Sequence, residues 1–500
     1  MASRFIRRVV IVGGGTAGWM TAAALGKLFG PQLEIRLIES EEIGTVGVGE
    51  ATIPQIRLFN ATLGLDENEF VRETQGSFKL GIEFDGWLRE GQAYMHAFGA
   101  IGGRDLGLVP FYHYWVKQRR AGQAGALGDY VFNSVAAYQN KFLRSASIPN
   151  SPLSNVQHAF HFDAGLYARY LRKHAEANGV QRIEGKVVDV AVDAESGHIR
   201  HVQLQNGPCV EGELFIDCSG FRGLLIEQSL NTGYHDWRQW LPCDRAIAVP
   251  CASVQPLTPY TRASARSAGW QWRIPLQHRI GNGLVYCSDY MSDDEAASSL
   301  LARLDGEALA EPRPLRFVTG MRKQFWNKNC IAIGLSSGFM EPLESTSIHF
   351  IQSSIGKLIA FFPQQGFSQV EIDEYNRQVQ FEFIRSRDFL ILHYLANQRE
   401  EPFWQRCRAM DIPDSLADKI ELFRQSGRVF KEHEELFTEP SWVQVMIGQG
   451  IVPERYHPMV ETLGDEEVRR MVDGVGALLN RAAQVMPDHL EYIRKTCAAP

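Results

Sequence analysis

The stretch that decides the fold reads Val9-Val10-Ile11-Val12-Gly13-Gly14-Gly15-Thr16-Ala17-Gly18. Its β-branched residues predict a buried strand, and its glycines predict a tight turn. The alanine-rich run Met20–Leu28 then predicts a helix. A second apolar run, Leu33–Ile38, predicts another strand that ends at Glu39, 21 positions after Gly18. Strand, helix and strand in this order form a βαβ unit.

The spacing within this βαβ unit indicates a dinucleotide site. Glycines let the backbone approach a pyrophosphate, and the N-terminus of the helix stabilises the negative charge. An acidic side chain about 20 residues further on accepts hydrogen bonds from ribose hydroxyls. We predict this role for Glu39 in preference to that of a solvated carboxylate at a strand end. The predicted cofactor contacts in this unit are Gly13, Gly15, Thr16, Ala17, Gly18 and Glu39.

Composition narrows the class of protein. With 500 residues, 45% of them hydrophobic and 22% charged, the chain is typical of a soluble globular protein with two or three domains, or one large domain with a cap. A net charge of -7 argues against a nucleic-acid partner. Eight cysteines without a C-x-x-C pair predict neither a disulfide framework nor a metal site. Without a signal peptide or an apolar run of about 20 residues, we expect a cytoplasmic protein without a membrane anchor.

The rest of the chain continues as an α/β protein and then becomes helical. Further strands are predicted at 202–204, 214–217 and 330–333. The run Trp270-Gln271-Trp272-Arg273-Ile274-Pro275 alternates with period two, which places Trp270, Trp272 and Ile274 on one face of a sheet. Helical periodicity follows at about 345–362 and 372–397, and proline-interrupted helices fill 403–500. We therefore predict a Rossmann-like α/β domain over residues 1–345 and a helical cap region over 346–500.

Four separated motifs resemble the tryptophan-halogenase family of FAD-dependent halogenases, over nearly the whole chain. They are Gly13–Trp19 (G-G-G-T-A-G-W), Phe78–Ile82 (F-K-L-G-I), Trp270–Pro275 (W-x-W-x-I-P) and Phe339–Thr346 (F-M-E-P-L-E-S-T). The resemblance implies an FAD-binding domain of the flavin monooxygenase type. It also implies reduced FAD supplied by a separate NAD(P)H-dependent flavin reductase, oxygen, and a halide ion that becomes hypohalous acid. The product would be a halogenated, electron-rich aromatic ring.

Two catalytic residues are implied by the resemblance. Lys79 stands in the F-K-L-G-I motif and corresponds to the lysine that delivers the halogen, either by hydrogen-bonding hypohalous acid or by forming a haloamine. Glu344 corresponds to the glutamate that stabilises the cationic ring intermediate and accepts its proton. In most proteins the side chains of Lys and Glu lie on the solvated surface. The apolar neighbours of both residues favour the catalytic interpretation here, because an idle charge among them would be costly.

Cofactor and halide contacts are also implied by the resemblance. The loop 47–52 resembles a segment that lies along the flavin, and Gly334 resembles a glycine on its ribityl side, although Leu335 replaces the acid that usually follows it. The loop contributes Gly47, Gly49, Glu50, Ala51 and Thr52. Backbone amides of Thr346 and Ser347 would hold the halide. Well-known tryptophan halogenases have glycine at the second position, so Ser347 reshapes the pocket, and we predict that bromide is used better than chloride.

The predicted substrate site has an aromatic wall and lacks an amino-acid clamp. His96 and Phe98 resemble residues that line this site in the family, and Phe98 would stack on an indole. Trp270, Trp272, Ile274 and Pro275 resemble the strand that separates the organic substrate from the flavin. The stretch 435–442 lacks the adjacent tyrosines that bind the tryptophan backbone in the family. The chain is thus more similar to members that act on indole or other non-tryptophan aromatics.

Two other functions are compatible with the same fold. An FAD-dependent aromatic monooxygenase would share the cofactor site but would not need Lys79 or the W-x-W-x-I-P strand. A catalytically silent flavin-binding protein would lose nothing when Lys79 is replaced. The sequence leaves the natural substrate, the position of halogenation and a homodimer open.

Overall fold

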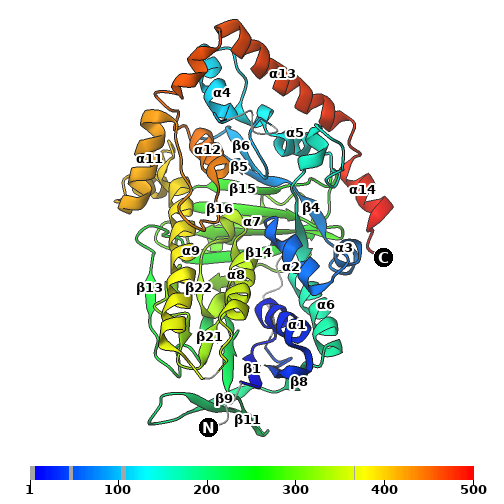
Figure 1. Cartoon of the computed structure of the whole chain (residues 1–500), viewed down its shortest axis with the longest axis vertical. Coiled ribbons are helices and arrows are strands. Elements are labelled where there is room, and N and C mark those ends of the chain that lie inside the picture. Colours follow the sequence, from blue (N-terminus) through cyan, green and yellow to red (C-terminus); the bar gives the residue numbers. More distant parts are fainter. Residues whose placement is uncertain (1–5, 44–48, 103–107, 365) are drawn as a thin grey trace. The chain divides into compact units, whose positions relative to one another are not determined.

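The computed structural model describes residues 6–43, 49–102, 108–364 and 366–500 (Figure 1). Its contacts divide into two compact units, each built from three segments of the chain. The first unit comprises Met1–Gln75, Phe162–Arg238 and Phe317–Phe383, and the second comprises Gly76–His161, Gln239–Arg316 and Ile384–Pro500. The two units interleave along the chain, whereas the sequence suggested consecutive regions 1–345 and 346–500.

The first unit is organised by a six-stranded sheet around the predicted βαβ unit. Its order is β20 (Trp326–Asn327), β21 (Cys330–Ala332), β12 (Leu214–Asp217), β1 (Arg8–Val12), β2 (Glu34–Glu39) and β8 (Gln181–Glu184). All neighbouring strands are parallel except β20 and β21. Parallel strands are buried on both faces, which explains the continuous apolar run of β1. The predicted strands and the helix α1 (Thr16–Phe29) are confirmed.

Parallel register brings the carboxyl ends of distant strands to one edge. Val12 at the end of β1 lies beside Asp217 of β12 and Ile38 of β2. The turns that follow β1, β12 and β21 therefore leave the sheet at neighbouring points, which is where ligands bind in open α/β sheets. The other elements of this unit are β3 (Gly49–Ala51), β9 (Val187–Val192), β10 (Ile199–Leu204), β11 (Cys209–Glu211), β13 (Tyr234–Asp236), β19 (Gly320–Arg322), β22 (Gly338–Phe339), α2 (Gln55–Leu63), α3 (Glu67–Glu73), α6 (Ala164–Ala177), α8 (Ser347–Ala360) and the first part of α9 (Gln369–Leu395).

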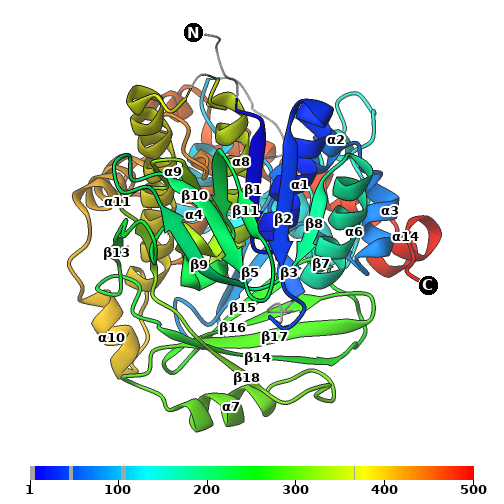
Figure 2. The same ribbon diagram turned by 90° about the horizontal axis from the view of Figure 1, so that it is seen from below.

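The second unit is organised by a seven-stranded sheet. Its order is β18 (Arg313–Arg316), β14 (Arg245–Ala252), β17 (Arg279–Tyr286), β16 (Gly269–Pro275), β15 (Thr261–Arg266), β5 (Gly81–Asp85) and β6 (Ala93–Ala97). Figure 2 shows β15, β16, β17, β14 and β18 following one another across this sheet. Every residue of β16 is buried, so the strand predicted from the alternating tryptophans is confirmed and is covered on both faces.

Helices and one short strand pair complete the second unit. β4 (Ser77–Lys79) pairs antiparallel with β7 (Ala159–Asp163). The helical periodicity predicted near the C-terminus is confirmed, and Pro402 and Pro440 lie in the first turns of α10 and α12, where the missing N–H costs nothing. The helices are α4 (Phe111–Arg120), α5 (Phe132–Tyr138), α7 (Asp293–Leu301), the second part of α9 from Ile384 on, α10 (Pro402–Arg408), α11 (Asp414–Ser426), α12 (Glu439–Gly448), α13 (Asp465–Gln484) and α14 (His489–Thr496).

Two properties concern the described part of the chain as a whole. None of its helices is long and apolar enough to cross a membrane. Among the same residues, no group of three or more His, Cys, Asp or Glu side chains is arranged to hold a metal ion. All eight cysteines are free thiols, and seven of them are buried.

Candidate active site

The glycine loop of the first unit is shaped to receive a diphosphate. Gly13 has φ +115°, and a Cβ there would lie 2.2 Å from the carbonyl oxygen of Cys218. A Cβ on Gly18 would lie 1.8 Å from the carbonyl oxygen of Gly13. Gly15, by contrast, has no described atom within 4 Å of an added Cβ, and it caps α1 without a side-chain hydrogen bond. The unpaired N–H groups of the first helical turn therefore start at an open position, as an anion site requires.

Glu39 lies directly against this loop. A Cβ on Gly14 would come within 1.6 Å of the Glu39 Oε2 atom, so only glycine leaves room for the carboxylate. Trp19 donates its indole N–H to Oε2 at 3.2 Å, and Arg182 donates to Oε1 at 2.5 Å. A carboxylate offers about four acceptor positions, so lone pairs remain for ribose hydroxyls. The geometry fits the predicted contact of Glu39 with a dinucleotide.

A second glycine turn completes the cofactor cradle. Gly334 follows β21 with φ +82°, and a Cβ there would lie 2.7 Å from the Cβ of Ala17 in the first turn of α1. The turn after β21 therefore touches the start of that helix. Asp217 supports the neighbouring turn, because its buried carboxylate accepts hydrogen bonds from the backbone N–H groups of Ser219 and Leu225. These residues fit FAD, which would be held by the glycine loop, Glu39 and the start of α1.

The predicted flavin loop is partly described. Gly49, Glu50 and Ala51 form β3, and Thr52 follows with a buried side chain. Gly47 lies outside the described residues. Burial raises the pKa of Glu50 to about 7, and the negative charge of Asp163 acts in the same direction. Glu50 is therefore the carboxyl of this loop that changes charge near neutral pH.

Glu50 makes the stability of the FAD-free protein depend on pH. A folded-state pKa of about 7, above the ordinary 4.5, means that the folded protein holds an extra proton between these values. The contribution of this protonated carboxyl to the free energy of unfolding is fully present below pH 4.5 and is lost as the pH rises through 7. We expect Glu50→Gln to remove roughly 2 to 3 kcal/mol of pH-dependent destabilisation at pH 8. Thermal melts of the FAD-free protein from pH 4.5 to 8 measure the difference. Glu73→Gln, at an exposed carboxylate, serves as the control, and parallel curves for wild type and Glu50→Gln would contradict the prediction.

The segment Pro342–Ser347 holds the second group of predicted residues. Glu344 ends a short 3-10 turn and is only 1% exposed. Ser345 adopts the left-handed conformation (φ 59°), which turns the chain so that α8 begins right after Thr346. The hydroxyl oxygen of Thr346 is buried and has no hydrogen-bond partner among the described residues. An orphaned hydroxyl beside the free N–H groups of a helix start fits an anion, as predicted for Thr346 and Ser347.

An ionic cluster anchors the start of α8. The carboxylate of Glu382 on α9 accepts hydrogen bonds from His349 Nε2 at 2.6 Å and Lys357 Nζ at 2.9 Å, and also from Ser353. Burial alone would raise the pKa of Glu382, but His349 and Lys357 outweigh it and lower the pKa to about 2. Glu382 is therefore ionised at neutral pH. It ties the helix that follows the predicted halide segment to α9.

The second unit brings Lys79 together with the predicted substrate residues. Lys79 is fully buried on β4, and its Nζ atom lies 5.4 Å from the centre of the Phe98 ring. The backbone N–H of Phe98 donates to Leu80 at 2.9 Å, and Ile82 pairs with His96 in the β5–β6 register. This pairing places the F-K-L-G-I motif beside the segment 96–98. A cation over an aromatic face is attracted by the ring quadrupole.

His96 lies in an aromatic cluster with Phe389 and Phe437. It is 4% exposed, and its ring packs 5.7 Å from Phe389 and 6.4 Å from Phe437. Trp442 packs edge-on against Phe389 at 4.8 Å and under the ammonium of Lys419 at 4.6 Å. Trp442 is therefore part of the core of this unit.

The tryptophan strand β16 is a packed wall. The rings of Trp270 and Trp272 lie 6.1 Å apart, in agreement with the predicted common face. Trp272 lies over Gly283 of β17, where a Cβ would come within 2.0 Å of the indole. At the end of the strand, the Pro275 carbonyl accepts a hydrogen bond from Ser77 of β4 at 2.6 Å. The wall is thus joined to the strand that carries Lys79.

The structure adds to the candidate active site one residue that the sequence did not indicate. His161 of β7 lies between Ser77 and Thr261, within hydrogen-bond distance of both hydroxyls. These partners are 84 and 100 residues away in the chain, so no local pattern identifies them. The only signal is a histidine between two phenylalanines in a short strand.

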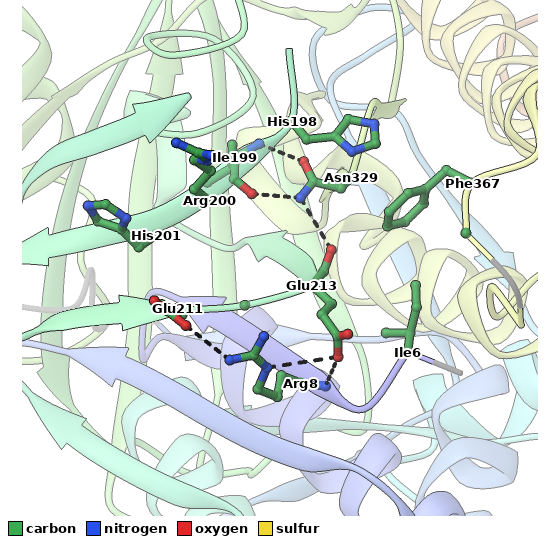
Figure 3. Close-up of a pocket in the computed structure, with 12 residues that line it drawn as sticks. Ile6, Arg8, His198, Ile199, Arg200, His201, Glu211, Glu213, Asn329 and Phe367 are labelled. Carbon is green, nitrogen blue, oxygen red and sulfur yellow. Dashed lines mark hydrogen bonds and ion pairs between the residues drawn. The ribbon is translucent and has the colours of Figure 1, made fainter. Parts of the chain in front are cut away.

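One pocket lies apart from all these residues. It has a volume of about 600 Å³ beside β10 and β11 in the first unit (Figure 3). Its polar groups bind one another: Arg8 pairs with Glu211 at 3.1 Å, and Asn329 bonds to both backbone groups of Ile199. None of its lining residues is a predicted site residue.

The glycine cradle, Glu39 and the parallel sheet define a Rossmann-type dinucleotide-binding oxidoreductase fold. The chain belongs to the tryptophan halogenase family, whose model matches residues 8–465. It is therefore a flavin-dependent halogenase that acts on an aromatic substrate, and the family implies FAD, halide and a flavin reductase. The predicted recognition and fold class are confirmed at this level.

Several relatives support this assignment. The flavin-dependent halogenase Xcc4156 from Xanthomonas campestris is 50% identical with a TM-score of 0.96, and 99% of each chain is covered. BrvH, a flavin-dependent halogenase from Brevundimonas sp. BAL3, is 45% identical with a TM-score of 0.94 and the same coverage. Tryptophan 6-halogenase SttH from Streptomyces toxytricini is 34% identical over 521 residues, which cover 98% of each chain.

Proposed function

We propose that this halogenase acts on indole, or on an indole ring within a larger scaffold, in preference to free tryptophan. We further propose that it uses bromide better than chloride. Lys79 and Glu344 are the catalytic residues of this proposal. The observation that carries the catalytic part of this proposal is the full burial of Lys79 beside the face of the Phe98 ring. An ammonium held there can polarise a halogen donor next to a stacked aromatic ring.

The segment 435–442 supports the exclusion of free tryptophan. Both carboxylate oxygens of Glu435 bind Lys419 at 2.9 Å, and the ring of Phe437 stacks on Phe389 at 3.8 Å. Trp442 is buried in the same cluster. The Glu435 carboxylate is already paired and cannot serve the ammonium of tryptophan, and these three side chains offer its carboxylate only the indole N–H of Trp442, which has no hydrogen-bond partner among the described residues. Burying those charges without partners costs binding energy, whereas neutral indole avoids the cost.

The remaining predicted residues take supporting roles in this proposal. The glycine loop, Glu39, residues 49–52 and Gly334 hold FAD, which when bound supplies the activation of oxygen. Thr346 and Ser347 hold the halide, with the buried Thr346 hydroxyl as an additional donor. Phe98 and His96 contact the substrate. Trp270, Trp272, Ile274 and Pro275 separate the substrate from the flavin in this proposal, and every one of them is buried in β16.

A product screen tests this function. Purified enzyme receives FAD, a flavin reductase, NADH and oxygen, with indole or tryptophan as substrate and bromide or chloride as halide. We expect bromoindole to form fastest, identified by its mass shift and isotope pattern. Faster turnover of tryptophan than of indole would refute the substrate proposal. A hydroxylated product formed without halide would instead support the aromatic monooxygenase alternative.

Ser347 is expected to set the halide preference. Its side chain occupies space at the start of α8, so an anion bound there keeps fewer water molecules. Chloride is the more strongly hydrated halide and loses more from this desolvation. We expect Ser347→Gly to raise the chloride rate relative to the bromide rate about fivefold to tenfold, or roughly 1 to 1.4 kcal/mol. Initial rates at saturating halide measure the ratio. Ala360→Gly, at the exposed far end of the same helix, is the control, and an unchanged ratio in Ser347→Gly would remove Ser347 from the halide site.

A further inference from the structure

We propose that His161 is a positioning residue for Lys79. Its imidazole joins the hydroxyls of Ser77 and Thr261 and so ties the strand that carries Lys79 to the end of the tryptophan strand. This inference rests on the proposed role of Lys79 in catalysis. All the residues involved belong to the second unit.

The geometry places His161 on the side of β4 from which Lys79 projects. Ser77 and His161 are directly paired in the β4–β7 register, and the Ser77 Oγ atom lies 3.1 Å from His161 Nδ1. The other ring nitrogen lies 2.9 Å from the hydroxyl of Thr261, the first residue of β15. Side chains two residues apart in a strand point to the same face. Lys79 therefore projects to the same face of β4 as Ser77.

The chemistry of the partners determines the direction of each hydrogen bond. The carbonyl oxygen of Pro275 can only accept, so Ser77 donates its single hydroxyl proton to it at 2.6 Å. The Ser77 oxygen must then accept from His161, which makes Nδ1 the protonated ring nitrogen. In the neutral imidazole, Nε2 accepts from Thr261. The chain runs in one direction, from Thr261 through His161 and Ser77 to Pro275.

The surroundings keep His161 neutral. Burial lowers its pKa well below 6.5, and the nearby charge of Lys79 lowers it further, together with His489 and Arg273. Protonation would require Thr261 to give up its donated hydrogen bond and would place a second cation near Lys79. The chain of hydroxyls and imidazole therefore holds β4 in place without adding a charge.

A second histidine holds the residue between Ser77 and Lys79. His489 Nε2 accepts the backbone N–H of Phe78 at 3.1 Å, and its Nδ1 donates to the Leu257 carbonyl at 2.8 Å. Burial lowers the pKa of His489 to about 4, so it too is neutral at pH 7. Both residues before Lys79 are thus held by buried neutral histidines. Small displacements of a reacting group have large effects on rate, so the position of β4 matters for the lysine amine.

The test distinguishes a role of His161 in positioning Lys79 from a general role in the stability of the protein. His161→Phe removes both hydrogen bonds, whereas His161→Asn keeps an N–H near the position of Nδ1 for Ser77. We expect His161→Phe to lower kcat for indole bromination 10- to 100-fold with KM and FAD affinity changed less than threefold. His161→Asn should recover kcat to within about fivefold of wild type. Ser77→Ala, a smaller change that breaks the same chain, should lower kcat about fivefold to twentyfold.

His113 provides the matched control. It is a buried histidine of the same unit whose pKa is lowered to about 4, and its ring packs at 4.4 Å on Tyr112. His113→Phe should reduce the Tm without lowering kcat. An equal loss of kcat in His113→Phe and His161→Phe, or full activity in Ser77→Ala, would overturn the proposal.

The double variant distinguishes this inference from the proposed function. If His161 acts through Lys79, Lys79→Ala with His161→Phe should be no slower than Lys79→Ala alone. If the double variant instead shows the product of the two single losses in kcat, His161 acts independently of Lys79, and the inference is overturned. Full activity of the single variant Lys79→Ala would instead refute the catalytic role on which the inference rests.

Discussion

Replacement of Lys79 by methionine is expected to lower the rate of indole halogenation about 10²- to 10⁴-fold while FAD binding is retained. Methionine keeps most of the length of the unbranched side chain but removes the ammonium that lies over the Phe98 ring. Removal of a group that donates a proton or transfers the halogen typically costs about 10² to 10⁴ in rate. Product formation by mass spectrometry and FAD affinity by fluorescence quenching measure the two properties separately. Lys79→Ala should behave in the same way.

The same variant distinguishes formation of the oxidant from its delivery. Halide oxidation needs FAD and the halide site, so Lys79→Met should still consume reduced flavin and release hypohalous acid into a chemical trap. Lys419→Met is the control, because Lys419 is a buried lysine of the same unit that pairs with Glu435. Its loss should lower the Tm, because the buried Glu435 carboxylate would keep only its longer ion pair with Arg385 at 3.6 Å, but should keep turnover. Undiminished halogenation by Lys79→Met would show that Lys79 is not catalytic.

Glu344→Gln is expected to have the second largest effect. Glutamine keeps the size of a side chain that is only 1% exposed, but it replaces one carboxylate oxygen by an NH2 donor and cannot offer a negative charge or accept the ring proton. Loss of electrostatic stabilisation and of a general base should lower kcat about 100-fold, with KM for indole little changed. Steady-state kinetics with bromide and a flavin reductase measure both constants.

Glu341→Gln is a control from the same segment. Glu341 lies three residues before Glu344 and is equally buried, so its substitution perturbs the same turn. We expect Glu341→Gln to keep kcat within about threefold of wild type. Equal losses of kcat in the two variants would indicate that any glutamine in this turn disturbs it. Glu344 would then have no special role in the reaction. A raised KM with normal kcat in Glu344→Gln would move this residue from the reaction to substrate binding.

The cofactor fold was predictable because its signal is local and contiguous. A strand buried on both faces reads as an unbroken apolar run, as in β1, and the turn after it requires glycines at particular positions. The structure supplied the reasons: Gly13 has a positive φ, and Gly18 touches the Gly13 carbonyl. The tryptophan strand was predictable for the same reason, since alternation with period two needs no information about partners.

The burial of the catalytic candidates was less accessible to sequence reasoning. The apolar neighbours of Lys79 suggested burial, but its contact with Phe98 depends on the pairing of β5 with β6. The orphaned hydroxyl of Thr346 likewise depends on the turn at Ser345 and on packing around α8. The proposed halide site therefore gained support that a motif alone does not provide.

Local sequence was sufficient for the dinucleotide fold, for the helix α1, for the strands β1, β2, β10, β12, β16 and β21, for the helical character of the region after about residue 345, and for the family to which the chain belongs. Tertiary structure alone decided that the two units interleave and that Glu435, Phe437 and Trp442 pack in the core. It also decided that His161 binds partners 84 and 100 residues away. The physical reason is that backbone conformation follows short-range sterics and periodicity. Hydrogen bonds and burial of a side chain depend instead on which distant strands the fold brings together.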